Sequence, residues 1–133
     1  MENYFLLAIG YWNLIGSIVL YLMLNEAIAD KILRQWIEII TVPYDVGKYG
    51  SLWLVWAAST NTFFSVINVL AVHWARTSQV VVVCGDLFVY GIFLLSIIVV
   101  LNDKNYGRGL YVSIFLTIFW MLWAIYSLFV LSL

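Results

Sequence analysis

The chain has 133 residues, of which 65% are hydrophobic and 10% are charged, and its net charge is −1. Soluble domains carry about 25% charged residues, so this composition excludes a water-soluble globule. With only six Lys and Arg residues the chain has no basic surface for nucleic acid, and its single cysteine excludes a disulfide framework within the chain. We therefore expect an all-α integral membrane protein.

Four apolar stretches are long enough to cross a bilayer, which takes about 20 residues in a helix. They lack the strict alternation of apolar and polar residues that is typical of transmembrane β-strands. The sequence therefore predicts a single domain, residues 1–133, of four transmembrane helices in an antiparallel bundle. The predicted spans are residues 4–24, 52–74, 80–101 and 110–133.

The segment between the first two spans, residues 26–42, has a different pattern. Its apolar residues, from Ile28 to Ile40, fall on one side of a helical projection, and charged residues fill most of the other side. Pro43 then stops the helix. We predict an amphipathic helix that lies in the membrane interface, with a docking face for a partner subunit as the alternative.

The distribution of basic residues predicts the orientation, because Lys and Arg accumulate in cytoplasmic loops. Loops 25–51 and 102–109 contain five of the six Lys and Arg residues, and Arg76 is the sixth. We therefore expect a multi-pass membrane protein with these two loops on the cytoplasmic side and both termini on the non-cytoplasmic side.

Polar side chains inside the spans form the candidate site, since polar groups are costly in lipid and face the bundle interior or a cavity. Depth along each helix, at about 1.5 Å per residue, places them in the outer half of the bilayer, with Asn68 and Asp86 at one level. His73 lies near the outer mouth of this region. The predicted intramembrane polar site consists of Asn13, Asn61, Ser65, Asn68, Asp86 and Tyr90.

Asp86 is the only carboxylate well inside a predicted span, and no Lys or Arg lies in a span to pair with it. An ionised aspartate at the centre of a membrane helix costs on the order of 3 kcal/mol. We therefore expect Asp86 to be neutral, hydrated, hydrogen-bonded to Asn and Tyr, or paired with another subunit. It could handle protons or contact a cation or polar ligand, or it could belong to a hydrogen-bond network between helices.

The residue inventory contains no complete catalytic or redox site. A single histidine excludes bis-histidine haem, and a single cysteine excludes a redox-active thiol pair. We expect no catalytic residue, no metal site and no cofactor in the isolated chain. The length and span count resemble those of several small four-span families, among them the DoxX-like proteins associated with quinone-linked oxidoreductases and the small multidrug resistance transporters. No motif assigns the chain to any of them, and the glutamate that the multidrug transporters carry inside their first span has no counterpart in residues 4–24. A contact with lipid or quinone is left open.

Two functions follow from these observations. The first is a non-catalytic accessory or structural subunit of a larger membrane protein complex, whose partners are lipid and either other membrane subunits or copies of itself, but not nucleic acid. The alternative is a small oligomeric transporter or ligand-binding membrane protein, which would use Asp86 and an Asn- and Ser-lined pocket in the outer half of the bilayer. An enzyme is the least favoured class, because a partner would have to supply the reactive centre.

Overall fold

The computed structural model of the chain describes residues 3–32, 47–101 and 109–133, and every regular element in these ranges is a helix. All of them except the short second helix are long and apolar enough to cross a membrane. The predicted all-helical class and the four apolar helices are thus confirmed. In chain order the helices are α1 (Tyr4–Leu22), α2 (Glu26–Ile32), α3 (Gly47–Ala71), α4 (Arg76–Val100) and α5 (Gly109–Ser132).

Helix boundaries differ from the predicted spans most at the start of α3, which is Gly47 rather than residue 52, and at the connection between α3 and α4. α3 ends at Ala71 rather than at residue 74, and α4 begins at Arg76 rather than at residue 80. The reason is that hydropathy marks the segment that fits the hydrocarbon, whereas a helix needs only a continuous series of backbone hydrogen bonds. That series in α4 begins with the amide of Gln79, which donates to the carbonyl of Ala75 at 3.0 Å.

Asparagine side chains start the two N-terminal helices. Asn3 Oδ1 accepts a hydrogen bond from the backbone amide of Phe5 at 3.2 Å, and Asn25 Oδ1 accepts one from the amide of Ala27 at 3.1 Å. Such caps satisfy amide groups that have no partner within the helix. The helix that begins after Asn25 is α2, which is the described part of the predicted amphipathic segment, and residues 33–42 of that segment lie outside the described residues.

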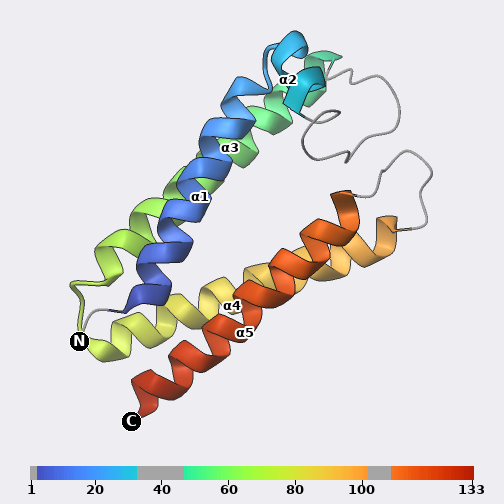
Figure 1. Cartoon of the computed structure of the whole chain (residues 1–133). Coiled ribbons are helices and arrows are strands. Elements are labelled where there is room, and N and C mark those ends of the chain that lie inside the picture. Colours follow the sequence, from blue (N-terminus) through green and yellow to red (C-terminus); the bar gives the residue numbers. More distant parts are fainter. Residues whose placement is uncertain (1–2, 33–46, 102–108) are drawn as a thin grey trace.

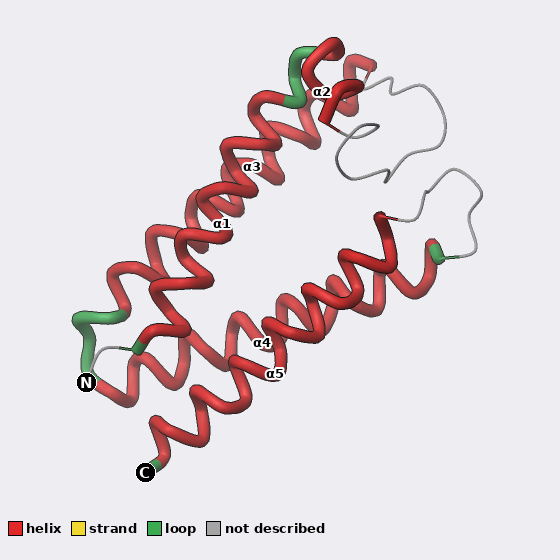
Figure 2. The backbone as a smooth tube through the Cα atoms, viewed as in Figure 1, coloured by secondary structure: helices red, strands yellow, loops and turns green. Residues whose placement is uncertain are grey.

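The four long helices form two antiparallel pairs, a first pair of α1 with α3 and a second pair of α4 with α5 (Figure 1). The pairs meet at the end where α1 begins and α5 ends, and they diverge toward the end where α2 lies (Figure 2). We call these the joined end and the open end. Contacts between the pairs are made mainly by α3 with α4 and by α1 with α5.

The main apolar core lies at the joined end and draws on all four long helices. Trp120 of α5 is at its centre, with only 7% of the residue exposed. Its ring stacks on that of Trp123 at a centroid distance of 5.5 Å and meets the edge of Phe5 at 6.4 Å. Aromatic packing therefore contributes to holding α1 against α5. The buried members of this core are Phe5, Leu6, Ile9, Ala71, Val83, Trp120 and Ala124.

Within the first pair, small residues let α1 approach α3 closely. A Cβ atom at Gly10 would lie 2.8 Å from Val69 Cγ2 and 3.2 Å from the carbonyl oxygen of Ser65. Farther along α1, the hydroxyl of Ser17 donates to the carbonyl of Ala58 at 2.8 Å. Small residues at helix crossings have this role in membrane proteins, where close packing replaces the hydrophobic effect.

We expect Gly10→Ala to destabilise the protein, because a methyl group forced into packed surroundings costs about 1–3 kcal/mol. Gly85→Ala is the matched control, since a Cβ there would meet nothing within 4 Å. Both changes raise helix propensity by about 1 kcal/mol, so the difference between them isolates the contact. The measurement is a titration of each variant, held in mild detergent, with sodium dodecyl sulfate. Circular dichroism gives the unfolding midpoint. Equal midpoints for the two variants would contradict the close approach of α1 and α3.

Candidate functional site

The seven predicted site residues lie on three helices and one turn. Four of them are buried, Asn61 and Tyr90 are partly buried, and His73 is exposed in the turn after α3. The buried four are Asn13 on α1, Ser65 and Asn68 on α3, and Asp86 on α4.

Asn68 and Asp86 form a hydrogen bond between the two helix pairs. Asn68 Nδ2 donates to Asp86 Oδ1 at 3.1 Å and also to the carbonyl oxygen of Phe64 at 2.9 Å. Asn68 is fully buried, and Asp86 is 3% exposed. The expectation that these two residues lie at one level is thus confirmed, and their contact ties α3 to α4.

A second hydrogen bond between the pairs lies one helical turn farther along α4. The hydroxyl of Tyr90 donates to Asn13 Oδ1 at 3.2 Å. Because residues four apart share a helix face, Asp86 and Tyr90 present one side of α4 to the first pair. Two polar contacts on successive turns therefore connect α4 to α3 and to α1.

The other three predicted residues are outside these two contacts. Ser65 is buried beside Gly10, and its backbone carbonyl oxygen would lie 3.2 Å from a Cβ atom on that glycine. Asn61 lies beside Gly16, with its Nδ2 atom 3.3 Å from the place a Cβ on that glycine would take. His73 is exposed at the joined end. The structure thus brings four of the seven residues together, as two hydrogen-bonded pairs.

Two oxygen atoms of the Asn68–Asp86 pair have no partner in the described part of the chain. They are Asn68 Oδ1 and Asp86 Oδ2, and both are buried. The two N–H groups of the Asn68 amide are already engaged, so only an additional donor can satisfy these acceptors. A buried polar atom without a partner costs about 1–3 kcal/mol. Each of these two oxygens therefore needs a hydrogen-bond donor, which a proton on Asp86 or a group from another molecule would supply.

A second group of polar contacts, which the sequence interpretation did not include, lies at the joined end. The amide of Asn3 contacts the Ser127 hydroxyl through its nitrogen at 3.0 Å and its oxygen at 3.1 Å, which links α1 to α5. Arg76 Nη2 donates to the carbonyl of Val130 at 3.0 Å, which links α4 to α5. Asn3 and Arg76 lie outside the apolar stretches, where polar residues are ordinary. Only the capping position of Asn3 gives a signal in the sequence.

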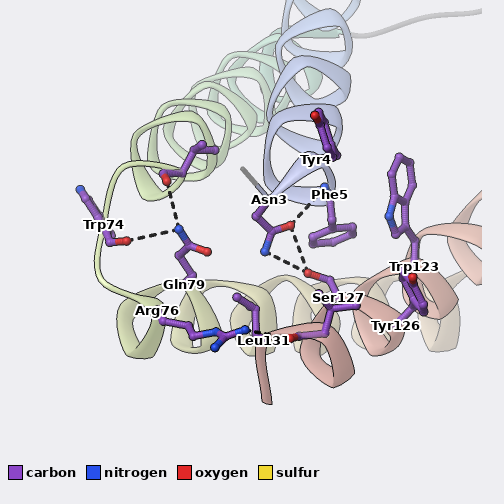
Figure 3. Close-up of a pocket in the computed structure, with 12 residues that line it drawn as sticks. Asn3, Tyr4, Phe5, Trp74, Arg76, Gln79, Trp123, Tyr126, Ser127 and Leu131 are labelled. Atoms are coloured by element: carbon purple, nitrogen blue, oxygen red, sulfur yellow. Dashed lines mark hydrogen bonds between the residues drawn. The ribbon is translucent and has the colours of Figure 1, made fainter. Parts of the chain in front are cut away.

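These contacts border a pocket of about 770 Å³ at the joined end (Figure 3). Residues from the start of α1, the α3–α4 connection, the first turn of α4 and the last part of α5 line it. None of the seven predicted site residues is among them. The candidate sites are thus two: the polar pairs around Asp86, and this pocket.

No protein-family model matches the chain, and no curated protein or solved structure matches it. Within the part of the chain that the structure describes, no three or more His, Cys, Asp or Glu residues gather to hold a metal ion. We therefore infer the function from the geometry of the two candidate sites.

We expect Tyr90→Phe to lower the free energy of unfolding by about 0.6–1.7 kcal/mol, the range measured for hydrogen bonds between membrane helices. The change removes only the hydroxyl that donates to Asn13. Tyr111→Phe is the matched control, because the Tyr111 side chain is 64% exposed. Detergent unfolding of both variants tests the contact. Equal stability of the two would show that the Tyr90 hydroxyl does not bind Asn13.

Proposed function

We propose that this chain is a multi-pass integral membrane protein in which the four long helices cross the bilayer as an antiparallel unit. The support is the apolar surface of the helices, since only 17–33% of the residues in each span are buried inside the protein. Large rings such as Phe88 and Phe115 are 69% and 70% exposed. An apolar surface of this extent matches lipid rather than water. The bias of Lys and Arg supports a non-cytoplasmic joined end.

We propose further that the protein is a non-catalytic accessory subunit of a larger membrane complex. The observation that supports this role is the use of the intramembrane polar groups: Asn68 bonds to Asp86, and Tyr90 bonds to Asn13. These side chains join the chain's own helices. The outer faces of the long helices are left apolar and rich in aromatic rings, a surface suited to lateral packing against other membrane subunits, copies of this chain, or lipid.

In this proposal Asp86 is a neutral carboxylic acid that belongs to the helix contact. A carboxylic acid and a carboxamide that face each other form two hydrogen bonds in one ring. The first of these, from Asn68 Nδ2 to Asp86 Oδ1, is present at 3.1 Å. The two atoms of the second, Asp86 Oδ2 and Asn68 Oδ1, are the oxygens without a partner. One proton on Asp86 Oδ2 would satisfy both, and it would also remove the cost of a charge in lipid.

Substitution of Asp86 tests this arrangement. Asp86→Asn supplies an N–H group in place of the acid O–H group, so the ring is retained and stability is expected to stay close to that of the parent chain. Asp86→Ala leaves one N–H group and the oxygen of the Asn68 amide without a partner, while the bond to the Phe64 carbonyl is kept, and we expect a loss of about 1–3 kcal/mol. Infrared difference spectra between the parent and Asp86→Asn should contain the carbonyl band of a protonated acid. Equal destabilisation by both variants, with no such band, would contradict a neutral Asp86.

The alternative function, a transporter or ligand-binding protein that uses Asp86, is favoured by the same two oxygens. A donor group of a ligand, or a cation, could satisfy Asp86 Oδ2 and Asn68 Oδ1 instead of a proton. This alternative predicts that the protein binds a ligand in a pH-dependent way. It also predicts that Asp86→Asn abolishes the binding while the protein stays folded.

Native mass spectrometry of the particle, extracted from its source in mild detergent or nanodiscs, tests the accessory role. The expected result is the 15.3-kDa chain together with other polypeptides. A monomer, or a homo-oligomer whose bound small mass is not a phospholipid, would contradict the accessory role, and the second outcome would favour ligand binding. We also expect the chain to become less stable when the other polypeptides are removed.

A further inference from the structure

The pocket at the joined end combines a cation, aromatic rings and an unsatisfied acceptor. Figure 3 shows Trp74, Arg76 and Gln79 on one side and Trp123 and Tyr126 on the other, with Asn3, Phe5 and Ser127 between them. Arg76 and Gln79 are three residues apart in the first turn of α4, so both lie on one face of that helix.

Gln79 is, with Ser127, one of the two buried polar residues that line this pocket among the described residues, and 6% of Gln79 is exposed. Its Nε2 atom is engaged, because it donates to the carbonyl of Val72 at 3.0 Å and to the carbonyl of Trp74 at 3.2 Å. Its Oε1 atom accepts no hydrogen bond from the described residues and, in Figure 3, points across the pocket toward Asn3 and Ser127. Since Asn3 and Ser127 bond to each other, the Gln79 oxygen is open to a donor from a ligand.

Arg76 supplies the positive charge. One of its terminal nitrogens donates to the carbonyl of Val130 at 3.0 Å, and a guanidinium carries five N–H groups in all. Among the described residues that line the pocket there is no acidic side chain. The guanidinium therefore keeps donors for an anion, and its planar fork of N–H groups is best matched by two oxygens of a phosphate or carboxylate group.

The rest of the lining is apolar or aromatic, with Phe5, Val72, Trp123 and Leu131 among its residues. Tyr4 and Trp74 also line it and are exposed. Aromatic residues at the ends of spans mark the level of the lipid head groups. A ligand here would thus contact charged and polar groups with its head and apolar side chains with its tail.

We propose that this pocket binds an anionic phospholipid whose head group carries a hydroxyl, with the phosphate on Arg76 and the hydroxyl donating to Gln79 Oε1. The acyl chains would lie against the apolar lining on the Trp123 side. This inference depends on insertion in a membrane, as in the proposed function, but it is independent of the accessory role. The shared head-group chemistry also fits free glycerol phosphate, so the test compares the two sources.

Native mass spectrometry of the purified full chain, with each added compound, tests the site. The probes are dioleoyl phosphatidylglycerol, dioleoyl phosphatidylcholine, dioleoyl phosphatidic acid and glycerol phosphate. We expect phosphatidylglycerol to bind best, phosphatidic acid to be weaker because its head group lacks the glycerol hydroxyls, and phosphatidylcholine to be weakest. Equal binding of the three lipids, or binding of glycerol phosphate as strong as that of phosphatidylglycerol, would overturn the proposal.

Variants test whether the preference for phosphatidylglycerol arises at this pocket. Arg76→Gln should lower the preference for phosphatidylglycerol over phosphatidylcholine about tenfold, as expected for loss of a charged hydrogen bond. Arg76→Lys keeps the charge and should restore part of the preference. Lys31→Gln, which removes an exposed charge from α2 at the open end, should leave it unchanged. An unaltered preference in Arg76→Gln, or an equal loss in Lys31→Gln, would overturn the site. Neither outcome depends on whether partner subunits are found.

Discussion

The hydrogen bond between Asn68 and Asp86 is the contact on which the relative position of the two helix pairs depends. Both side chains are buried, and each lies on a helix that is otherwise apolar over much of its length. In the proposed membrane setting neither group has water as an alternative partner, so separation of the pairs would expose an amide and a carboxyl group to hydrocarbon. The bond from Tyr90 to Asn13 adds a second point one turn away and fixes the facing side of α4.

The two kinds of helix contact use different chemistry. Inside the first pair, Gly10 and the Ser17–Ala58 contact permit a close approach of backbones, which gains dispersion energy without a hydrophobic driving force. Between the pairs, the contacts are polar at Asp86 and aromatic around Trp120. The pairs therefore join at one end and diverge toward the other (Figure 1). In the proposed accessory role, the diverging apolar faces are available to lipid or to another subunit.

Much of this architecture follows from the sequence because the relevant signals are local. An apolar run of span length predicts a membrane helix, and a short connection places the end of α3 beside the start of α4. The number of residues from that connection, at about 1.5 Å per residue, predicts that Asn68 and Asp86 lie at the same depth. The run of small residues at 57–60, which includes Ala58, likewise predicts that another helix crosses α3 closely there.

Other features depend on rotation and tilt, which one sequence does not specify. Asn61 shares a face of α3 with Asn68 but lies seven residues, about 10 Å, away along the helix, where it meets Gly16 of α1 instead of Asp86. The divergence of the pairs has no single residue as its signal in the sequence. Gln79 lies one residue outside a predicted span, and only the fold shows that it is buried at the pocket.

A double-mutant cycle between Asn68→Ala and Asp86→Ala, in a detergent that keeps the chain folded, measures the central contact most directly. Its coupling energy separates the bond between the two side chains from the general cost of each truncation. The expected result is a loss in the double variant that is clearly smaller than the sum of the two single losses, because the second truncation removes a group that has already lost its partner. Additive losses would show that the two side chains do not interact, and the proposed connection between the helix pairs would be wrong.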